Sequence, residues 1–199
     1  SIMVFAAMML ILASAILLPL YLKGSLLLTA FTAGLVLLPG GLVNGLMSPF
    51  AGTLFDKYGP KFLVIPGFIM TTITTFFLSD ITTTTSTTII IILHTCLFIG
   101  IALIMMPAQT NGLNQLPPAF YPDGSAVMNT LSQIAGAIGT AVAVSIMAAG
   151  QENYNSNLKG MPNVETMAEA LTAGIQNAFL FALIASIIGL VVSLFVKRV

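Results

Sequence analysis

Four polar side chains lie within otherwise apolar runs of the chain: Asn44, His94, Asn129 and Gln133. Amide and imidazole groups that face hydrocarbon lose their hydrogen bonds, so such side chains are expected to face protein or water. They can bind a small molecule in a cavity or a backbone carbonyl of a neighbouring helix, and the residue types leave both uses open. Met47 follows Asn44 by three residues and adds a flexible thioether suited to apolar ligands. These five residues are the candidates for a substrate cavity.

Covalent and metal chemistry is not expected. An enzyme needs a nucleophile with a base, or a cluster of metal ligands, but His94 is the only histidine and Cys96 the only cysteine. No carboxylate lies near the middle of an apolar run. The net charge is zero, with no basic patch for nucleic acid. The sequence therefore predicts neither an enzyme nor a cofactor, metal or nucleic-acid site.

The elements that carry these residues are membrane helices. The chain has 199 residues, of which 57% are hydrophobic and 6% charged, against about 25% charged in soluble domains. About 20 apolar residues cross the ~30 Å hydrocarbon core. The sequence therefore predicts an all-α membrane protein, with residues 1–199 as one bundle of six transmembrane helices and 150–172 as an external loop. The spans are expected at about residues 2–22, 31–55, 62–79, 88–106, 124–149 and 173–196.

A charged turn separates the second and third spans. It reads Gly52-x-Leu54-x-Asp56-Lys57-x-Gly59-x-Lys61. The two glycines are expected to allow a close approach of backbones, and Asp56 to neutralise the positive end of the next helix. Lys57 and Lys61 place the turn on the cytoplasmic side by the positive-inside bias. Six crossings then put both Ser1 and Val199 in the cytoplasm. A turn that only sets the topology is the alternative.

The fifth span carries a polar stripe. Its members recur at helical spacing, which places them on one face of the helix: Ser125, Asn129, Gln133, Gly136 and Thr140. Gly136 and Gly139 also suit close packing of a neighbouring membrane helix. Packing explains the glycines without any function, whereas Asn129 and Gln133 are harder to explain by packing and leave cavity lining as an equal alternative.

Together these stretches resemble the C-terminal half of the fourteen-helix drug:proton antiporters of the major facilitator superfamily. The resemblance rests on the charged turn and, in chain order, on Gly34-Leu-Val-Leu-Leu-Pro-Gly40, Ser48-Pro49-x-x-Gly52, Pro107, Leu116-Pro117, Asp123-Gly-Ser-Ala126 and Gln133-x-x-Gly136-x-x-Gly139-Thr-Ala141. It covers about residues 2–149 and weakens beyond them.

The resemblance implies one six-helix bundle, which is half of a proton-coupled multidrug or cationic-compound efflux antiporter working by alternating access. The implied partners are the N-terminal half of the same transporter, the lipid bilayer of the plasma membrane, protons and a small amphipathic or cationic substrate. The first, second, fourth and fifth spans would line the cavity, and the charged turn would act as a conformational switch.

The family's proton-coupling carboxylates have no counterpart in this chain and are expected in the N-terminal half. Ser1 begins directly in apolar sequence, which suggests a fragment. The alternative function is a six-helix membrane scaffold or channel subunit that transports nothing and assembles through the Gly136 and Gly139 face.

Overall fold

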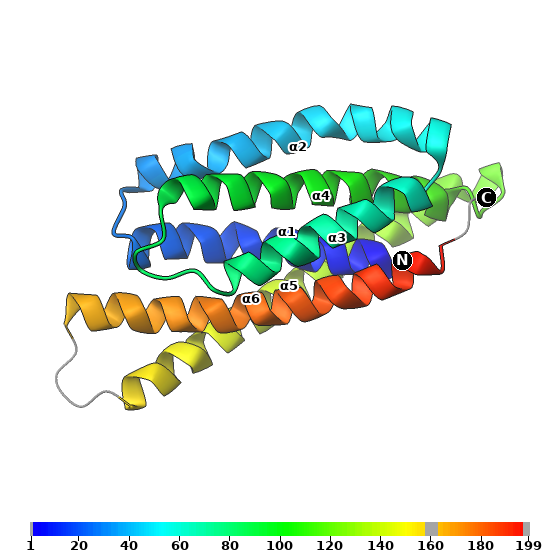
Figure 1. Ribbon diagram of the computed structural model, residues 1–199. Coiled ribbons are helices and arrows are strands. Elements are labelled where there is room, and N and C mark those ends of the chain that lie inside the picture. Colours follow the sequence, from blue (N-terminus) through cyan, green and yellow to red (C-terminus); the bar gives the residue numbers. More distant parts are fainter. Residues whose placement is uncertain (1, 158–162, 197–199) are drawn as a thin grey trace.

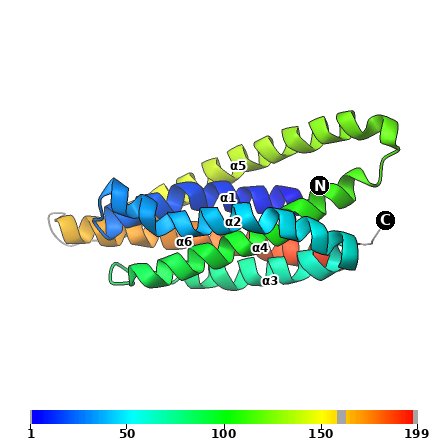
Figure 2. The same cartoon turned by 90° about the horizontal axis from the view of Figure 1, so that it is seen from above.

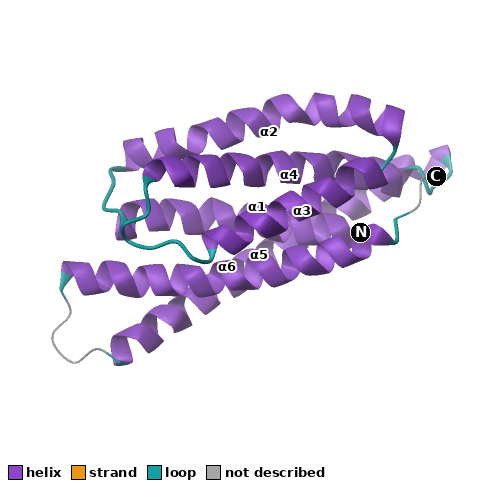
Figure 3. Cartoon of the chain, viewed as in Figure 1, coloured by secondary structure: helices purple, strands orange, loops and turns teal. Residues whose placement is uncertain are grey.

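The computed structural model describes residues 2–157 and 163–196, and every regular element in them is a helix. Figures 1 and 3 show the long helices running alongside one another. Two short segments add to them, a π-helix (η1) after α1 and a 3₁₀ helix (η2) before α5. The elements are α1 (Ile2–Leu20), η1 (Tyr21–Ser25), α2 (Ala30–Tyr58), α3 (Lys61–Leu78), α4 (Thr87–Leu113), η2 (Pro118–Phe120), α5 (Tyr121–Ser156) and α6 (Val164–Leu194).

Six of the described helical segments are long and apolar enough to cross a membrane. The predicted fold class, an all-α membrane protein of six transmembrane helices, is confirmed. The start of α1, the α2–α3 turn and the end of α6 lie at one end of the bundle (Figure 1), as six successive crossings require. Ser1 and Val199 lie outside the described residues, so their cytoplasmic location stays a prediction.

The segment 150–172 was expected as a loop, and this expectation is wrong for most of its length. α5 continues to Ser156 and α6 already begins at Val164. Asn163 caps α6: its side chain accepts a hydrogen bond from the Thr166 amide, and the Thr166 hydroxyl accepts one from the Asn163 amide. Polarity marks where a helix leaves the hydrocarbon, but a helix extends into water wherever its residues tolerate helical geometry.

The helices pack as a ring with two flanking members. α1, α4, α3 and α6 contact one another in that order and close the ring, while α2 packs mainly on α4 and α5 packs on α1 and α6. Figure 2 shows the second half of α6 and α3 on one side of the bundle and α5 on the other, where its first turns diverge from the rest. α2 has the smallest buried share of the six spans.

Small residues set the closest helix contacts. A Cβ on Gly67 of α3 would lie 2.8 Å from the carbonyl oxygen of Gly100 on α4, and a Cβ on Gly139 of α5 would lie 2.8 Å from the Cα of Met9 on α1. Membrane helices associate through such contacts, because lipid provides no hydrophobic drive between them. These pairs therefore determine which helices are neighbours.

Candidate functional site

Asn129 and Gln133 are the two cavity candidates whose side chains are not covered by another helix in the structure. Both lie on α5 and are exposed, and neither side chain has a hydrogen bond within the described residues. α5 rests on α1 through an adjacent face that includes the buried Ser132, Ala135 and Gly136. The two amides thus stand beside the α1–α5 contact and are free to hydrogen-bond a molecule on the open side.

The predicted polar stripe is divided by this contact. Gly136 is buried, and a Cβ there would strike the side chain of Leu12 on α1. Gly139 is buried against the backbone of Met9. The stripe therefore follows the edge of the packed face, with its amides outside and its glycine inside. The same packing occupies the Gly136 and Gly139 face, so this face is not available for the assembly of a scaffold.

Asn44 makes a hydrogen bond between helices. Its Nδ2 donates to the carbonyl oxygen of Phe98 at 3.0 Å, which joins α2 to α4. The side chain is half-buried, as is that of Met47 one turn further along α2. Of the two uses that the sequence left open for Asn44, the structure shows the interhelical bond.

His94 fills the space between α2 and α4. It is 5% exposed, and its ring lies against Gly40, where an added Cβ would be 2.6 Å from the imidazole Cε1. The His94 ring also lies beside the Phe98 ring, with the two centroids 4.6 Å apart. Only glycine at position 40 leaves room for this imidazole. His94 and Asn44 thus both contact Phe98 and fix the packing of α2 on α4.

The α2–α3 turn is short and held on both sides. Gly59 has φ 80° and ψ 175°, a region essentially restricted to glycine, and its amide donates to the Phe55 carbonyl at 2.8 Å. Pro60 then caps α3, which begins at Lys61. The Tyr58 and Phe62 rings stack across the turn with centroids 5.3 Å apart. The turn therefore holds the two helices in a fixed relation.

The charged groups of this turn point outward. Asp56, Lys57 and Lys61 are exposed, and the Lys57 ammonium lies 5.2 Å from the centre of the Tyr58 ring. Gly52 does not behave as expected. A Cβ there would meet only the methyl of Met106, at an ordinary 3.5 Å, so close backbone approach does not explain this glycine.

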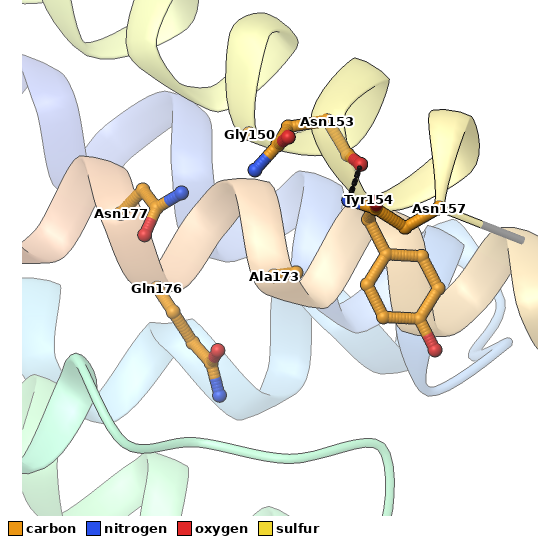
Figure 4. Close-up of a pocket in the computed structure, with 7 residues that line it drawn as sticks. All are labelled: Gly150, Asn153, Tyr154, Asn157, Ala173, Gln176 and Asn177. Carbon is orange, nitrogen blue, oxygen red and sulfur yellow. Dashed lines mark hydrogen bonds between the residues drawn. The ribbon is translucent and has the colours of Figure 1, made fainter.

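A polar pocket of about 400 Å³ lies between α5 and α6, next to the close contact of Gly150 with Gly174. Figure 4 shows Asn153 and Asn177 reaching into this space from opposite helices. Tyr154 turns away and donates to the Glu169 carboxylate at 2.7 Å, while Gln176 donates to the Ile81 carbonyl at 2.8 Å. The sequence reasoning missed the α5 side of this pocket because it assigned 150–172 to a loop. The four-residue spacing of Asn153 and Asn157 was the available signal.

Residues 2–157 and 163–196 contain no group of three His, Cys, Asp or Glu side chains that could hold a metal ion. The sites in this part of the chain are built from amides, aromatic rings and single charges.

The comparisons with known proteins agree on a family. The family model described as Major Facilitator Superfamily matches residues 1–140. The chain is 67% identical over its whole length to the lincomycin resistance protein LmrB of Bacillus subtilis and 61% identical over 99% of its length to the protein of that name from Listeria monocytogenes. It is 27% identical over 94% of its length to the riboflavin transporter RibZ of Clostridioides difficile.

The chain spans about two fifths of the length of these curated relatives: 41%, 42% and 39%, respectively. The family model covers residues 1–140, and two relatives are more than 60% identical over essentially the whole chain. Both findings point to the same family. The prediction that the chain is not an enzyme is confirmed, because its homologues are transporters. This chain belongs to the Major Facilitator Superfamily of membrane transporters.

Proposed function

We propose that this chain is the C-terminal six-helix half of a fourteen-helix, proton-coupled antiporter that exports multiple drugs or cationic compounds by alternating access. The relatives from B. subtilis and L. monocytogenes carry the name of a lincomycin resistance protein, which supports export of a drug. The chain covers 41% of the B. subtilis relative, close to the share that six helices take of fourteen. The rest of that relative's length has room for a second bundle.

The observation that carries the proposal is the open amide pair on α5. Asn129 and Gln133 are exposed in a segment that must cross hydrocarbon, and amides do not face lipid without cost. A second bundle facing α5 would enclose them in a polar cavity. We assign Asn129 and Gln133 to direct substrate contact, and Met47 to the apolar wall. Asn44 and His94 shape the cavity through the α2–α4 packing.

α2 supplies a second open surface. Added Cβ atoms at Gly34, Gly41 and Gly45 would meet no atom within 4 Å. Small residues on an uncovered membrane helix leave room for a close helix contact, and the N-terminal half of the transporter is the proposed partner. Large apolar side chains are exposed on α2 as well as on α3 and α6, so the uncovered glycines and not apolar exposure distinguish α2.

The proton pathway is assigned to the N-terminal half. The described carboxylates lie toward the ends of the helices: Asp56, Asp80, Asp123, Glu152, Glu165 and Glu169. None lies at mid-membrane depth, where a coupling carboxylate is expected to work. His94 has an unperturbed pKa of about 6.5 that suits proton transfer, but it is enclosed by the α2–α4 packing. We therefore do not assign the coupled proton to His94.

We assign the α2–α3 turn to the cytoplasmic side of the plasma membrane, where it acts as a conformational switch. Its end of the bundle carries Lys57 and Lys61, whereas Lys23 is the one described lysine at the other end. Asp56, Lys57 and Lys61 are exposed on a turn held by Gly59, so they can contact the other half in one transport state and release it in the other.

The test uses cells that carry the intact gene. Ethidium efflux should require the transporter and a proton gradient. Asp56→Asn should cut the efflux rate by roughly fivefold or more with normal membrane insertion, because it weakens a contact made in one state only. Asp80→Asn removes the same charge at the opposite end and should export like wild type. Absence of gradient-dependent efflux of ethidium and lincomycin by the wild type would refute the function, and normal efflux by Asp56→Asn would refute the switch.

A further inference from the structure

A groove lies at the proposed cytoplasmic end, between the end of α4, η2 and the first turns of α5. Its volume is about 420 Å³, within the ~300–1,000 Å³ of small-molecule sites. It is lined by Gly112, Leu116, Phe120, Asp123, Gly124, Val127 and Met128.

The walls are apolar although this end of the chain is polar. Leu116 is 37% exposed, Phe120 56% and Val127 58%, close in sequence to the exposed Asn114 and Gln115. Scattered apolar residues on a surface need no explanation, but apolar residues that gather around one hollow mark a binding site. An apolar group of a ligand can therefore be buried in this groove, away from water.

The lining of the groove contains one charged side chain. Asp123 is the sole charged residue in its lining, and no hydrogen bond or ion pair to another residue engages its carboxylate in the described part of the chain. A carboxylate beside aromatic and aliphatic walls favours a cation with an apolar surface and disfavours an anion.

The floor of the groove is adjustable. A Cβ on Gly112 would lie 3.1 Å from the methyl of Met128, so the thioether rests against the glycine and closes that side. Methionine has three rotatable bonds and adapts to irregular shapes. The groove can therefore accept apolar bodies of different outline, while Asp123 selects for charge.

We propose that this groove is a binding site for small monovalent amphipathic cations, which dock here from the cytoplasmic interface before they enter the central cavity. The proposal rests on the proposed efflux function and adds to it a first docking site and a charge preference. The apolar part of the ligand lies against Leu116, Phe120 and Val127, and its positive charge lies beside Asp123.

Asp123 also has a local structural role that the test must separate from binding. It lies in the first turn of α5, where a negative charge interacts favourably with the helix dipole. A structural effect of its removal would lower the affinity for every ligand equally, whereas a binding role affects cations alone.

The experiment measures equilibrium binding to the full-length transporter in nanodiscs, with two probes of similar size. Tetraphenylphosphonium is an amphipathic cation, and triphenylphosphine oxide is neutral. Asp123→Asn should raise the Kd of the cation about threefold to fivefold, as expected for an exposed charge pair, and change that of the neutral probe by less than about twofold. Asp123→Glu keeps the charge and should bind the cation with a Kd close to that of the wild type. Glu152→Gln removes a charge from the same helix at its other end and should change neither Kd.

Val127→Trp provides an independent test, because it fills the groove without changing its charge. It should weaken the binding of both probes. The proposal is overturned if Asp123→Asn leaves the cation Kd unchanged, if it weakens both probes equally, or if Val127→Trp binds both like wild type. The last result would mean that lipid or the absent part of the transporter covers the groove. Efflux by the wild type alongside any of these results leaves the proposed function standing, whereas a wild type that neither binds nor exports cations overturns both.

Discussion

Gly139→Ala tests whether a single backbone contact holds α5 against α1. A Cβ at this position would lie 2.8 Å from both the Cα and the Cβ of Met9. Favourable carbon–carbon contacts are about 3.5–4.0 Å, so the two helices must separate locally by roughly 1 Å. Backbone atoms cannot rotate away as a side-chain tip can. Overpacking of this kind costs about 1–3 kcal/mol.

The comparison variant is Gly41→Ala on α2, where an added Cβ meets no atom within 4 Å. Both substitutions gain up to about 1 kcal/mol of helix propensity. The difference in stability between the two variants therefore reports the contact with Met9 alone. At about 2–4 °C per kcal/mol for a chain of this size, Gly139→Ala should melt about 2–12 °C below Gly41→Ala. The assay is thermal unfolding of the 199-residue chain in detergent, followed by circular dichroism.

The melting temperature of Gly136→Ala should lie between those of Gly139→Ala and Gly41→Ala. Its Cβ meets the side chain of Leu12, which can change rotamer at lower cost. Equal melting of Gly139→Ala and Gly41→Ala would show that α1 and α5 are not in backbone contact. The assignment of Asn129 and Gln133 to the open edge of that contact would then lose its basis.

Three further predictions concern other residues. Asn129→Leu and Gln133→Leu should reduce the efflux of some compounds and spare others at an unchanged melting temperature, because neither amide bonds within the described chain; uniform loss with lower stability would instead indicate packing. Gly59→Ala should cost about 1–3 kcal/mol in thermal unfolding, because φ 80° with ψ 175° is strained for alanine, and unchanged stability would contradict this backbone geometry. His94→Gln should keep most pH-driven uptake in vesicles, and loss of coupling with intact substrate binding would place the proton in this half.

At the α5–α6 connection, hydropathy predicted the membrane spans but not the ends of the helices. The apolar runs located all six spans, because hydrocarbon excludes polar residues and the length of a span is set by membrane thickness. Hydropathy does not report where a helix ends in water, so it predicts a loop over residues 150–172, although α5 reaches Ser156 and α6 begins at Val164. The polar pocket beside the α5 extension has the spacing of Asn153 and Asn157 as its sequence signal, but that Gln176 and Asn177 of α6 line the same pocket comes from the structure.

The sequence by itself determined the fold class, the family resemblance and the polar residues that a membrane chain must shelter. The partner of each polar residue was decided by the tertiary structure. Asn44 and Asn129 are the same residue type within apolar runs, yet one donates to Phe98 and the other is open. The difference depends on which helix packs against each face, and this in turn depends on contacts such as Gly40 with His94 and Gly139 with Met9. Helical spacing fixes which residues share a face, but the neighbour of that face is set by contacts between residues far apart in the chain.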